Sequence, residues 1–412
     1  MKNIVIYGGG PTGMTMAYYL STKYNITLIE KDNSLGGCWK CKYIDGKYFS
    51  EHAPRVMGYN NSKFFEILKD IGADNFNNIY GNILTTTIKL SWFFLKNINI
   101  LDYIKLVFGI IYYDLSKYTV YEFCNNINLS DHTKKTLYYF SILLANSPKK
   151  LIVKEILDES IESFPTKFVQ FKDPMEWIIL LEKELIKRKV KIIKNAKLNK
   201  FMVDNNNISY SIVNHDIIKG DYHILAIPPN SLYKLLKNQD DVIKNNFMKY
   251  NKFLKWNRES HYSSFSFQFH FKKKINYNKP FGYPFYNDYN VIILPISNYV
   301  EKYTKDKNIK FVLSCCIVDM EMVIKKYNKK IKDLSKKTII DDILEIIDMK
   351  PDKITFYESD DNAFSLSKYG VMKEKGNINN FYTVGSHNKK GITTINKSVD
   401  IAYNFCFNNF LN

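Results

Sequence analysis

The segment Ile4-Val-Ile-Tyr-Gly8-Gly-Gly10-Pro-Thr-Gly13 decides the fold of this 412-residue chain. An apolar run that is typical of a buried strand ends in a Gly-x-Gly-x-x-Gly pattern, and residues 14–23 then have the composition of a helix. A second apolar run follows from Ile26 to Glu30. Strand, glycine turn, helix and strand in this order predict a βαβ unit and therefore an α/β fold.

The spacing of the glycines predicts a dinucleotide site. Gly8 permits a tight turn, Gly10 lets the backbone approach a pyrophosphate, and Gly13 lets the helix pack closely on the strand. The free N–H groups at the start of the helix attract the phosphate charge. Glu30 stands at the end of the next strand, where a carboxylate accepts hydrogen bonds from a ribose hydroxyl. Because a carboxylate repels a 2′-phosphate, these residues favour FAD or NAD over NADP.

Hydrophobic periodicity predicts a helical region followed by two groups of strands. Helices are expected at residues 62–72, 101–113, 120–126, 130–145, 174–189, 320–330, 338–349 and 394–410. Strands are expected at residues 191–193, 197–203, 208–213, 222–226, 290–295, 310–318 and 381–385. The strand signal is clearest in Ser263–Phe271, where Phe265, Phe267, Phe269 and Phe271 alternate with polar residues. Its Phe face is expected in the core.

Four segments together resemble the FAD-dependent flavin amine oxidase superfamily, which includes monoamine oxidases, protoporphyrinogen oxidases and phytoene desaturases. Ser34-Leu-Gly36-Gly37-Cys38-Trp39 is similar to the Leu-Gly-Gly-Arg loop that follows the glycine motif and its acidic residue. Glu51-His-Ala-Pro-Arg55-Val is similar to the Gly-Pro segment beside the flavin. Asp221–Pro229 is similar to the D-x-V-I-x-A-x-P segment, and Phe381–Gly385 with Gly391–Ile395 resembles the C-terminal FAD segment.

The resemblance implies a discontinuous Rossmann-like FAD-binding domain of the glutathione-reductase type, with an inserted helical and mixed-sheet substrate domain. The FAD-binding domain is expected at residues 1–61, 165–230 and 366–412, the helical region at 62–164, and the mixed α/β region at 231–365. FAD is expected to bind non-covalently, because no cysteine lies between Ser386 and Val399, where covalent-flavin members carry theirs. The implied cofactor contacts are Gly8, Gly10, Pro11, Thr12, Gly13, Glu30, Lys31, Gly36, Gly37, Cys38, Trp39, Pro54, Arg55, Val56, Ala226, Pro228, Gly385, Ser386, Thr393, Thr394 and Ile395.

Two positions depart from the superfamily pattern. Cys38 stands where the superfamily has arginine, and Ser386 stands where an acidic residue is usual. Lys40, Lys42 or Arg55 is expected to meet the diphosphate instead, and Arg55 is favoured because it lies inside a matching motif. Thr394 is also expected to cap the last helix, whether or not a cofactor binds there.

The candidate catalytic residue is Lys272. It extends the polar side of the Ser263–Phe271 strand, and many amine oxidases place a lysine on such a strand. The alternative is a solvated surface lysine, since six lysines lie within residues 249–274. Cys38-x-x-Cys41 has two interpretations, a redox dithiol or two small residues in a loop, and a lone CxxC favours the second. Because it lacks a second ligand pair, no metal site is expected.

Charge and cysteine content restrict the function class. The formal net charge is +18, but only three of the cations are arginines, so specific nucleic-acid recognition is not expected. Six cysteines in a chain of this length predict no disulfide framework. No signal peptide and no run of about 18 uncharged apolar residues is recognised, which predicts a cytoplasmic location. Contact with a membrane surface is an additional expectation, because residues 84–121 are rich in aromatic side chains flanked by lysines. Core packing is the favoured interpretation of those aromatic side chains, which are Trp92, Phe93, Phe94, Tyr112 and Tyr113.

Three functions compete at this point. The first is a flavin oxidoreductase that transfers a hydride equivalent from an amine or an apolar small molecule to N5 of FAD. The second is a UDP-galactopyranose mutase-like isomerase, which normally needs arginines on the UDP diphosphate. The third is a non-catalytic descendant that keeps the fold as a binding module, suggested by Cys38 and Ser386.

Overall fold

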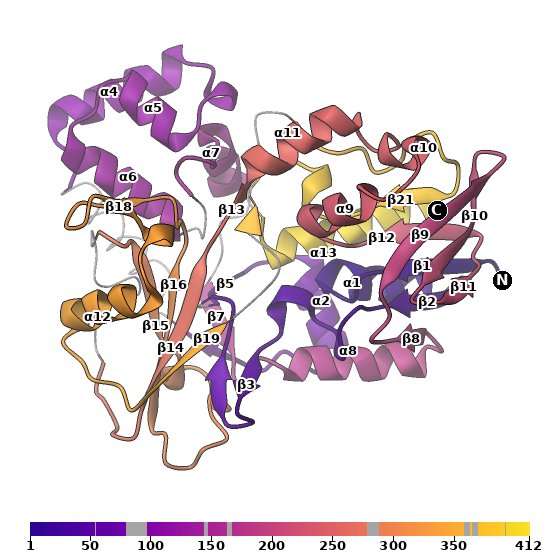
Figure 1. Ribbon diagram of the computed structural model, residues 1–412, viewed down its shortest axis with the longest axis horizontal. Helices are drawn as coiled ribbons and strands as arrows, with labels where there is room; N and C mark the ends of the chain where they lie inside the picture. The colour runs from indigo at the N-terminus through magenta and orange to yellow at the C-terminus, as the bar shows by residue number, and fades with distance from the viewer. Residues whose placement is uncertain are drawn as a thin grey trace.

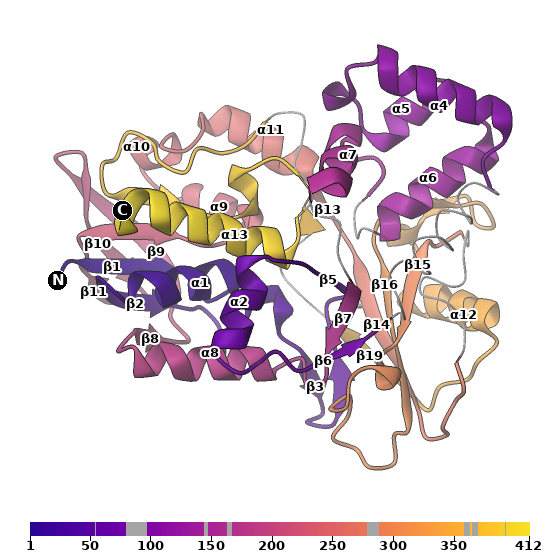
Figure 2. The ribbon, with the colours of Figure 1, turned by 180° about the vertical axis from the view of Figure 1, so that it is seen from behind.

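The computed structural model describes residues 1–53, 55–79, 97–143, 147–162, 167–277, 288–357, 363–364, 370–391 and 393–412. A parallel sheet with its helices forms one side of the molecule, and an antiparallel sheet with a group of helices above it forms the other (Figure 1). Figure 2 shows the same division from behind, with both chain termini on the side of the parallel sheet.

The parallel sheet is assembled from three distant parts of the chain. Its five strands lie in the order β21-β12-β1-β2-β8, and each neighbouring pair is parallel. The strands are β1 (Asn3–Tyr7), β2 (Asn25–Ile29), β8 (Lys191–Ile193), β12 (Tyr222–Leu225) and β21 (Phe381–Thr383). The predicted α/β fold with a discontinuous Rossmann-like domain is therefore confirmed, while its exact boundaries stay a prediction.

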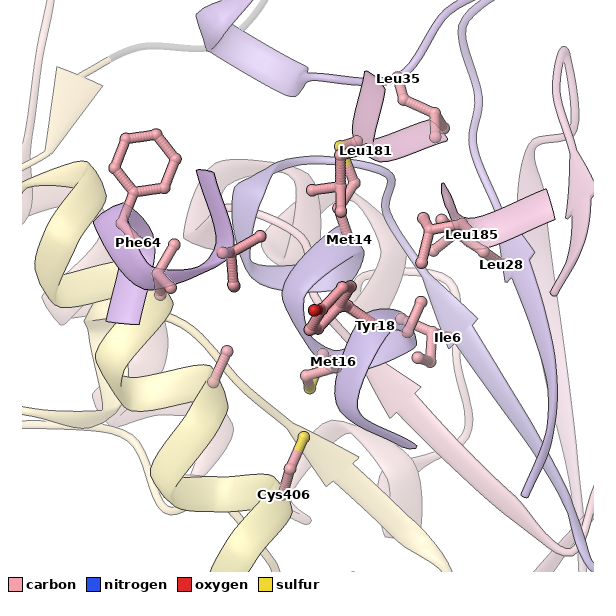
Figure 3. Close-up of a cluster of buried hydrophobic side chains, with 14 of the residues drawn as sticks. Ile6, Met14, Met16, Tyr18, Leu28, Leu35, Phe64, Leu181, Leu185 and Cys406 are labelled. Atoms are coloured by element: carbon pink, nitrogen blue, oxygen red, sulfur yellow. The ribbon is translucent and has the colours of Figure 1, made fainter. Parts of the chain in front are cut away.

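One face of the parallel sheet is covered by helices α1, α2, α8 and α13. They span Pro11–Leu20, Lys63–Asp70, Glu176–Lys187 and Ile395–Cys406. Ile4 and Ile6 of β1 point into this layer and belong to its buried apolar core. Figure 3 shows Met14 of α1 among buried side chains from the other three helices, which are Phe64, Leu181 and Cys406.

The opposite face of the parallel sheet packs against a second layer. Val5 and Tyr7, the alternate residues of β1, enter a core that includes Phe201 and Trp256. This layer consists of the antiparallel strands β9 (Leu198–Asp204), β10 (Asn207–Val213) and β11 (Asp216–Ile218) and the helices α9 (Pro229–Leu236), α10 (Asp241–Lys244) and α11 (Tyr250–Ser260). The alternation along β1 thus buries the strand on both faces, as expected for a central parallel strand.

The second large sheet is antiparallel, with the strand order β15-β16-β14-β19. Its strands are β14 (Phe265–Phe271), β15 (Val291–Pro295), β16 (Phe311–Ile317) and β19 (Lys353–Tyr357), and α12 (Lys336–Ile347) packs against it. Phe267, Phe269 and Phe271 are buried in the core between this sheet and α12, which confirms the prediction for the Phe face of the strand.

A group of helices lies beyond the antiparallel sheet (Figure 1). It consists of α4 (Ile100–Tyr112), α5 (Val120–Asn126), α6 (Asp131–Leu143) and α7 (Val153–Glu162). The prediction of core packing is wrong for α4, because Phe108 is 54% exposed and Tyr112 is 76% exposed. Trp92, Phe93 and Phe94 lie outside the described residues. Membrane contact through α4 stays a prediction; within the described residues no helix is long and apolar enough to cross a bilayer.

The helix predicted at residues 320–330 is also wrong. Val323–Ile324 (β17) and Lys329–Lys330 (β18) pair as a short antiparallel hairpin. Asn328 has φ of 49°, a left-handed conformation that asparagine tolerates in turns and that ends a helix. The remaining short strands are β3 (Lys42–Ile44), β4 (Tyr48–Ser50), β5 (Met57–Tyr59), β6 (Phe76–Asn78), β7 (Lys167–Phe171), β13 (His261–Tyr262) and β20 (Ala363–Phe364).

Candidate cofactor site

The carboxyl ends of the parallel strands bring the predicted cofactor residues to one edge of the sheet. Gly8 follows β1, Glu30 follows β2, Ala226 follows β12 and Gly385 lies shortly after β21. The Gly8 N–H donates to the Ile29 carbonyl at 2.8 Å, and the Ala226 N–H donates to the Tyr7 carbonyl at 2.8 Å. Ligands of open α/β sheets bind beyond this edge.

The glycine turn forms a cradle that side chains would fill. Gly8 has φ of 110°, and a Cβ on Gly13 would overlap the carbonyl oxygen of Gly8. At Gly10, by contrast, the nearest atom that a Cβ would meet is Cα of Gly37, at 3.9 Å. Gly10 is also the N-cap of α1, and no side chain caps this helix. The first N–H groups of α1 are thus available to a ligand at the open side of Gly10.

The carboxylate of Glu30 is fixed by the backbone around it. Glu30 is buried, and its two oxygens accept hydrogen bonds from the Gly9 N–H at 2.6 Å and the Asp32 N–H at 2.9 Å. Each carboxylate oxygen can accept more than one hydrogen bond, so both retain capacity for a hydroxyl donor. The structure therefore places the Glu30 carboxylate beside the glycine cradle, and its contact with a ribose stays a prediction.

The second glycine loop lies directly against the first. Gly36 and Gly37 have φ of 108° and 55°, conformations that favour glycine. The Gly36 N–H donates to the Gly9 carbonyl at 2.8 Å, and Gly37 faces Gly10. Cys38 and Trp39 continue this loop, and Cys38 is exposed whereas Cys41 is buried.

The start of α13 lies beside the segment that follows Arg55. Thr394 caps α13 by accepting a hydrogen bond from the Lys397 N–H at 3.2 Å, which confirms the predicted cap. The Asn396 side chain donates to the Gly58 carbonyl at 3.0 Å. The Ser386 hydroxyl is hydrogen-bonded to that of Ser398 at 2.7 Å.

The segment from Phe49 to Arg55 is fastened by buried side chains that donate to its carbonyls. Thr355 donates to Phe49 at 3.1 Å and Gln268 to Glu51 at 3.0 Å. Ser266 donates to His52, and Gln170 donates to Arg55 at 2.7 Å. Ser266 and Gln268 belong to the polar face of β14. That face therefore holds the flavin-side segment of the predicted motif in place, a role that was not predicted from the alternation of β14.

Arg55 is bound by its guanidinium to the second glycine loop. Its guanidinium donates to the carbonyls of Cys38 at 3.0 Å, Trp39 at 2.6 Å and Lys40 at 3.2 Å, and to the sulfur of Cys41 at 3.2 Å. It also lies 5.0 Å from the centre of the Trp39 ring. These acceptors occupy both terminal nitrogens, so Arg55 is bound to the second glycine loop, and its contact with a diphosphate stays a prediction.

The other two candidate cations are also engaged elsewhere. Lys40 forms an ion pair with Asp32, and the Lys42 ammonium lies 4.6 Å from the centre of the Tyr357 ring. The cradle formed by the two glycine loops therefore offers backbone N–H groups to a ligand. The charged groups of Lys40, Lys42 and Arg55 each meet another group of the chain.

Lys272 is not brought to this site. It is exposed just after the carboxyl end of β14, where its N–H donates to Asp352 at 2.7 Å. Ser266, which contacts His52, is near the other end of the same strand, and six residues of extended chain span roughly 20 Å. The interpretation as a surface lysine thus fits the structure. Pro54 lies outside the described residues.

Comparison with known proteins agrees with this geometry. Residues 6–71 match the family model described as an NAD(P)-binding Rossmann-like domain. Three solved structures cover nearly the whole chain: an oxidoreductase from Methanosarcina mazei, a putrescine oxidase mutant, and the cyclohexylamine oxidase of Brevibacterium oxydans. The first has a TM-score of 0.67 at 14% identity and covers 98% of this chain and 100% of its own.

The other two similarities are equally extensive. The putrescine oxidase has a TM-score of 0.65 at 13% identity over 99% of this chain and 98% of its own. The cyclohexylamine oxidase has a TM-score of 0.63 at 8% identity over 98% of this chain and 97% of its own. The chain has the fold of the FAD-dependent amine oxidases. The resemblance inferred from the four segments is confirmed at the level of the fold, and no curated protein sequence matches this chain.

The residues of this amine oxidase fold suit a dinucleotide cofactor, the class to which FAD belongs. The open space at Gly10, the uncapped start of α1 and the buried carboxylate of Glu30 are the features that a pyrophosphate and an adenosine ribose need. The side chains that position the flavin-side segment were missed from the sequence. They are Ser266, Gln268, Thr355 and Gln170, and the polar face of the β14 alternation was the available signal for the first two.

Proposed function

We propose that this protein is an FAD-dependent oxidoreductase of the amine oxidase type, which binds FAD non-covalently and oxidises an amine or an apolar small molecule. The observation that carries the proposal is the cradle at Gly10, open to a ligand and lined by the uncapped start of α1, with Glu30 beside it. The fold shared with putrescine oxidase and cyclohexylamine oxidase supports the same reaction class.

In this proposal the flavin supplies the acceptor for a hydride equivalent. The chain supplies binding and orientation. The start of α1 attracts the pyrophosphate, and Glu30 accepts hydrogen bonds from the ribose. Hydrogen bonds from Thr355 and Gln268 hold the backbone carbonyls of Phe49 and Glu51. The start of α13 favours negative charge beside it.

The positions of the three arginines favour this proposal over the isomerase alternative. A UDP diphosphate is best held by planar, bidentate guanidinium groups. Arg55 is bound to loop carbonyls, and Arg188 is hydrogen-bonded to Glu184 at 2.9 Å. Arg258 lies on the surface with its side chain 76% exposed. Two of the three arginines are thus bound to other groups of the chain, and the third is exposed to solvent. The non-catalytic alternative predicts that the purified protein does not retain FAD.

Substitution of Gly10 by alanine tests the proposed cofactor site. Gly10 has φ of −76° and ψ of −178°, which alanine adopts without strain, and the added Cβ meets no atom closer than 3.9 Å. We expect Gly10→Ala to fold normally but to bind FAD about 10- to 100-fold more weakly, because the methyl group occupies the space of the pyrophosphate. Titration of the FAD-free protein, followed by flavin fluorescence, measures this change.

Gly46→Ala is the matched control. Gly46 lies in an exposed turn with φ of 68° and no atom within 4 Å of a Cβ, so alanine there costs about 1 kcal/mol of stability. We expect this control to lower the melting temperature while leaving FAD affinity unchanged, the opposite of Gly10→Ala. Equal FAD affinity of Gly10→Ala and wild type would contradict the proposed site.

Anaerobic bleaching of the flavin by a panel of amines and polyenes then identifies the substrate class.

A further inference from the structure

The side chain of Glu51 is a buried carboxyl group without a hydrogen-bond partner. Glu51 is 0% exposed, and neither of its carboxyl oxygens has a partner in the described part of the chain. Its backbone carbonyl, by contrast, is held by Gln268. An ionised carboxylate that is buried without partners costs several kcal/mol, whereas a neutral carboxylic acid costs far less. This arrangement therefore suits the protonated form of Glu51.

The groups around Glu51 come from three elements. Arg55 follows it on the same segment, Cys41 precedes β3, and Cys316 lies on β16. Ser314, also on β16, interacts with Glu51 although its hydroxyl has no hydrogen-bond partner of normal geometry. Burial raises the pKa of Glu51 to about 7, against the opposing effects of Arg55 and Ser314. Both protonation states of Glu51 are thus accessible near neutral pH.

Arg55 is the positive group that an ionised Glu51 would attract. Among the described residues, the Glu51 carboxyl oxygens accept no hydrogen bond from Arg55, although both side chains are buried. The guanidinium instead donates to the carbonyls of residues 38–40 and to Cys41. One buried guanidinium therefore has two sets of competing acceptors: neutral carbonyls that it binds now, and a carboxylate that forms on loss of a proton. A charged acceptor makes the stronger hydrogen bond.

We propose that Glu51 is a positioning residue that releases the second glycine loop when it ionises, because its carboxylate draws Arg55 away from the carbonyls of residues 38–40. The proton passes to solvent, and no covalent bond or electron transfer is involved. Gly36 and Gly37 belong to this loop, so the cofactor cradle loosens at alkaline pH. The effect on FAD rests on the proposed function, whereas the movement of the loop does not.

Labelling of Cys41 tests the movement of the loop without FAD. Cys41 is buried against Arg55, and Cys38→Ser removes the exposed thiol of the same loop. In that background, the reaction rate of Cys41 with a maleimide is compared between Glu51 and Glu51→Gln at the same pH. The charge of an ionised Glu51 raises the pKa of Cys41 and therefore slows labelling, so it opposes the increase that loop opening predicts. We expect equal rates at pH 6 and a rate about fivefold higher with Glu51 at pH 8.5, because local opening increases.

Glu51→Met provides a second neutral side chain of similar length, so the comparison stands if the glutamine variant folds poorly. Equal labelling rates with Glu51 and with a folded neutral variant across this pH range would overturn the proposal. A larger rate for the neutral variant at pH 8.5 would overturn it as well.

FAD affinity provides the second measurement. We expect the affinity of wild type to fall about fivefold between pH 6 and pH 8.5, and that of Glu51→Gln to stay constant. A pH-independent FAD affinity of wild type, together with equal labelling rates, would leave the proposed function intact and remove the role of Glu51. Glu51-dependent labelling in a protein that never binds FAD would support the role of Glu51 and contradict the proposed function.

Discussion

Arg55→Met should lower the free energy of unfolding by about 4 kcal/mol, because it leaves four buried or partly buried acceptors without a donor. The guanidinium donates to three backbone carbonyls and one sulfur, and it lies against the Trp39 ring. Each buried carbonyl that loses its partner costs about 1–3 kcal/mol, and methionine recovers part of this by filling the space. Urea unfolding of the FAD-free protein measures the difference.

The other two arginines are the matched controls. Arg188 is partly exposed and makes hydrogen bonds to Glu184 and to the Tyr18 carbonyl, so Arg188→Met should cost about 1 kcal/mol. Arg258 is 76% exposed, and Arg258→Met should change stability by less than about 0.5 kcal/mol. The same substitution at three sites thus separates the effect of burial from that of the lost charge.

Arg55→Lys sharpens the comparison. Lysine keeps the charge but has a single ammonium group in place of the planar fork, so it cannot reach three carbonyls of one loop in the same geometry. We expect it to be nearly as unstable as Arg55→Met and to bind FAD more weakly than wild type. If Arg55→Lys matches wild type in both measurements, the loop does not depend on the guanidinium geometry.

The parallel sheet was predictable because its sequence signals are local. The glycine pattern, the apolar runs around it and Glu30 lie within thirty residues, and each has one physical reason that holds in any context. Even the role of Gly13 is visible in the pattern, since a close approach of helix and strand excludes a side chain there. The C-terminal strand and helix needed the family resemblance, because nothing local says that they join the same sheet.

The role of Arg55 was not predictable from composition or motif. Its rarity suggested a phosphate ligand, but its partners are backbone carbonyls, which no sequence pattern reveals. The same limit applies to β14. Alternation showed that Ser266 and Gln268 share a face, but it could not show that this face meets the segment from Phe49 to Arg55. The polar face of β14 continues to Lys272, which lies beyond the end of the strand that is opposite to Ser266.

The exposed face of α4 shows a further limit of periodicity. The apolar spacing over residues 101–113 correctly predicted a helix, but apolar side chains such as Phe108 and Tyr112 are exposed. Their helix buries Asp102 instead, whose side chain accepts hydrogen bonds from Ser130. Periodicity identifies an element by its pattern, whereas the neighbours that cover it depend on tertiary structure.

Acid should destabilise the protein through its buried histidines. Burial lowers the pKa of His223, His270 and His387 to about 4 each, below the ordinary value of 6.5. A group with a depressed pKa binds its proton more readily in the unfolded chain. Its contribution to stability is therefore complete above pH 6.5 and is lost as the pH falls toward 4, at up to about 1.4 kcal/mol per pH unit for each histidine.

Carboxyl groups with raised pKa values oppose this trend. Glu51 takes up a proton in the folded protein below pH 7, and burial also raises the pKa of Glu155, Glu374 and Asp400. These groups stabilise the fold as the pH falls toward the pKa values that they have in the unfolded chain. The effect of the three histidines exceeds that of the four carboxyl groups, of which one is fully buried and three are partly buried. The free energy of unfolding therefore falls by a few kcal/mol between pH 7 and pH 4.5.

His387→Gln isolates one histidine of the three. The His387 ring is buried and hydrogen-bonded to the Thr383 hydroxyl at 3.0 Å, an interaction that the glutamine amide can replace. We expect this variant to lose less stability than wild type between pH 6.5 and pH 4.5, with the slope reduced by about 1.4 kcal/mol per pH unit. Urea unfolding of the FAD-free protein at several pH values gives both slopes. His215→Gln, at an exposed position, should leave the slope unchanged, and an equal slope in all three proteins would mean that His387 is protonated equally in the folded and unfolded states.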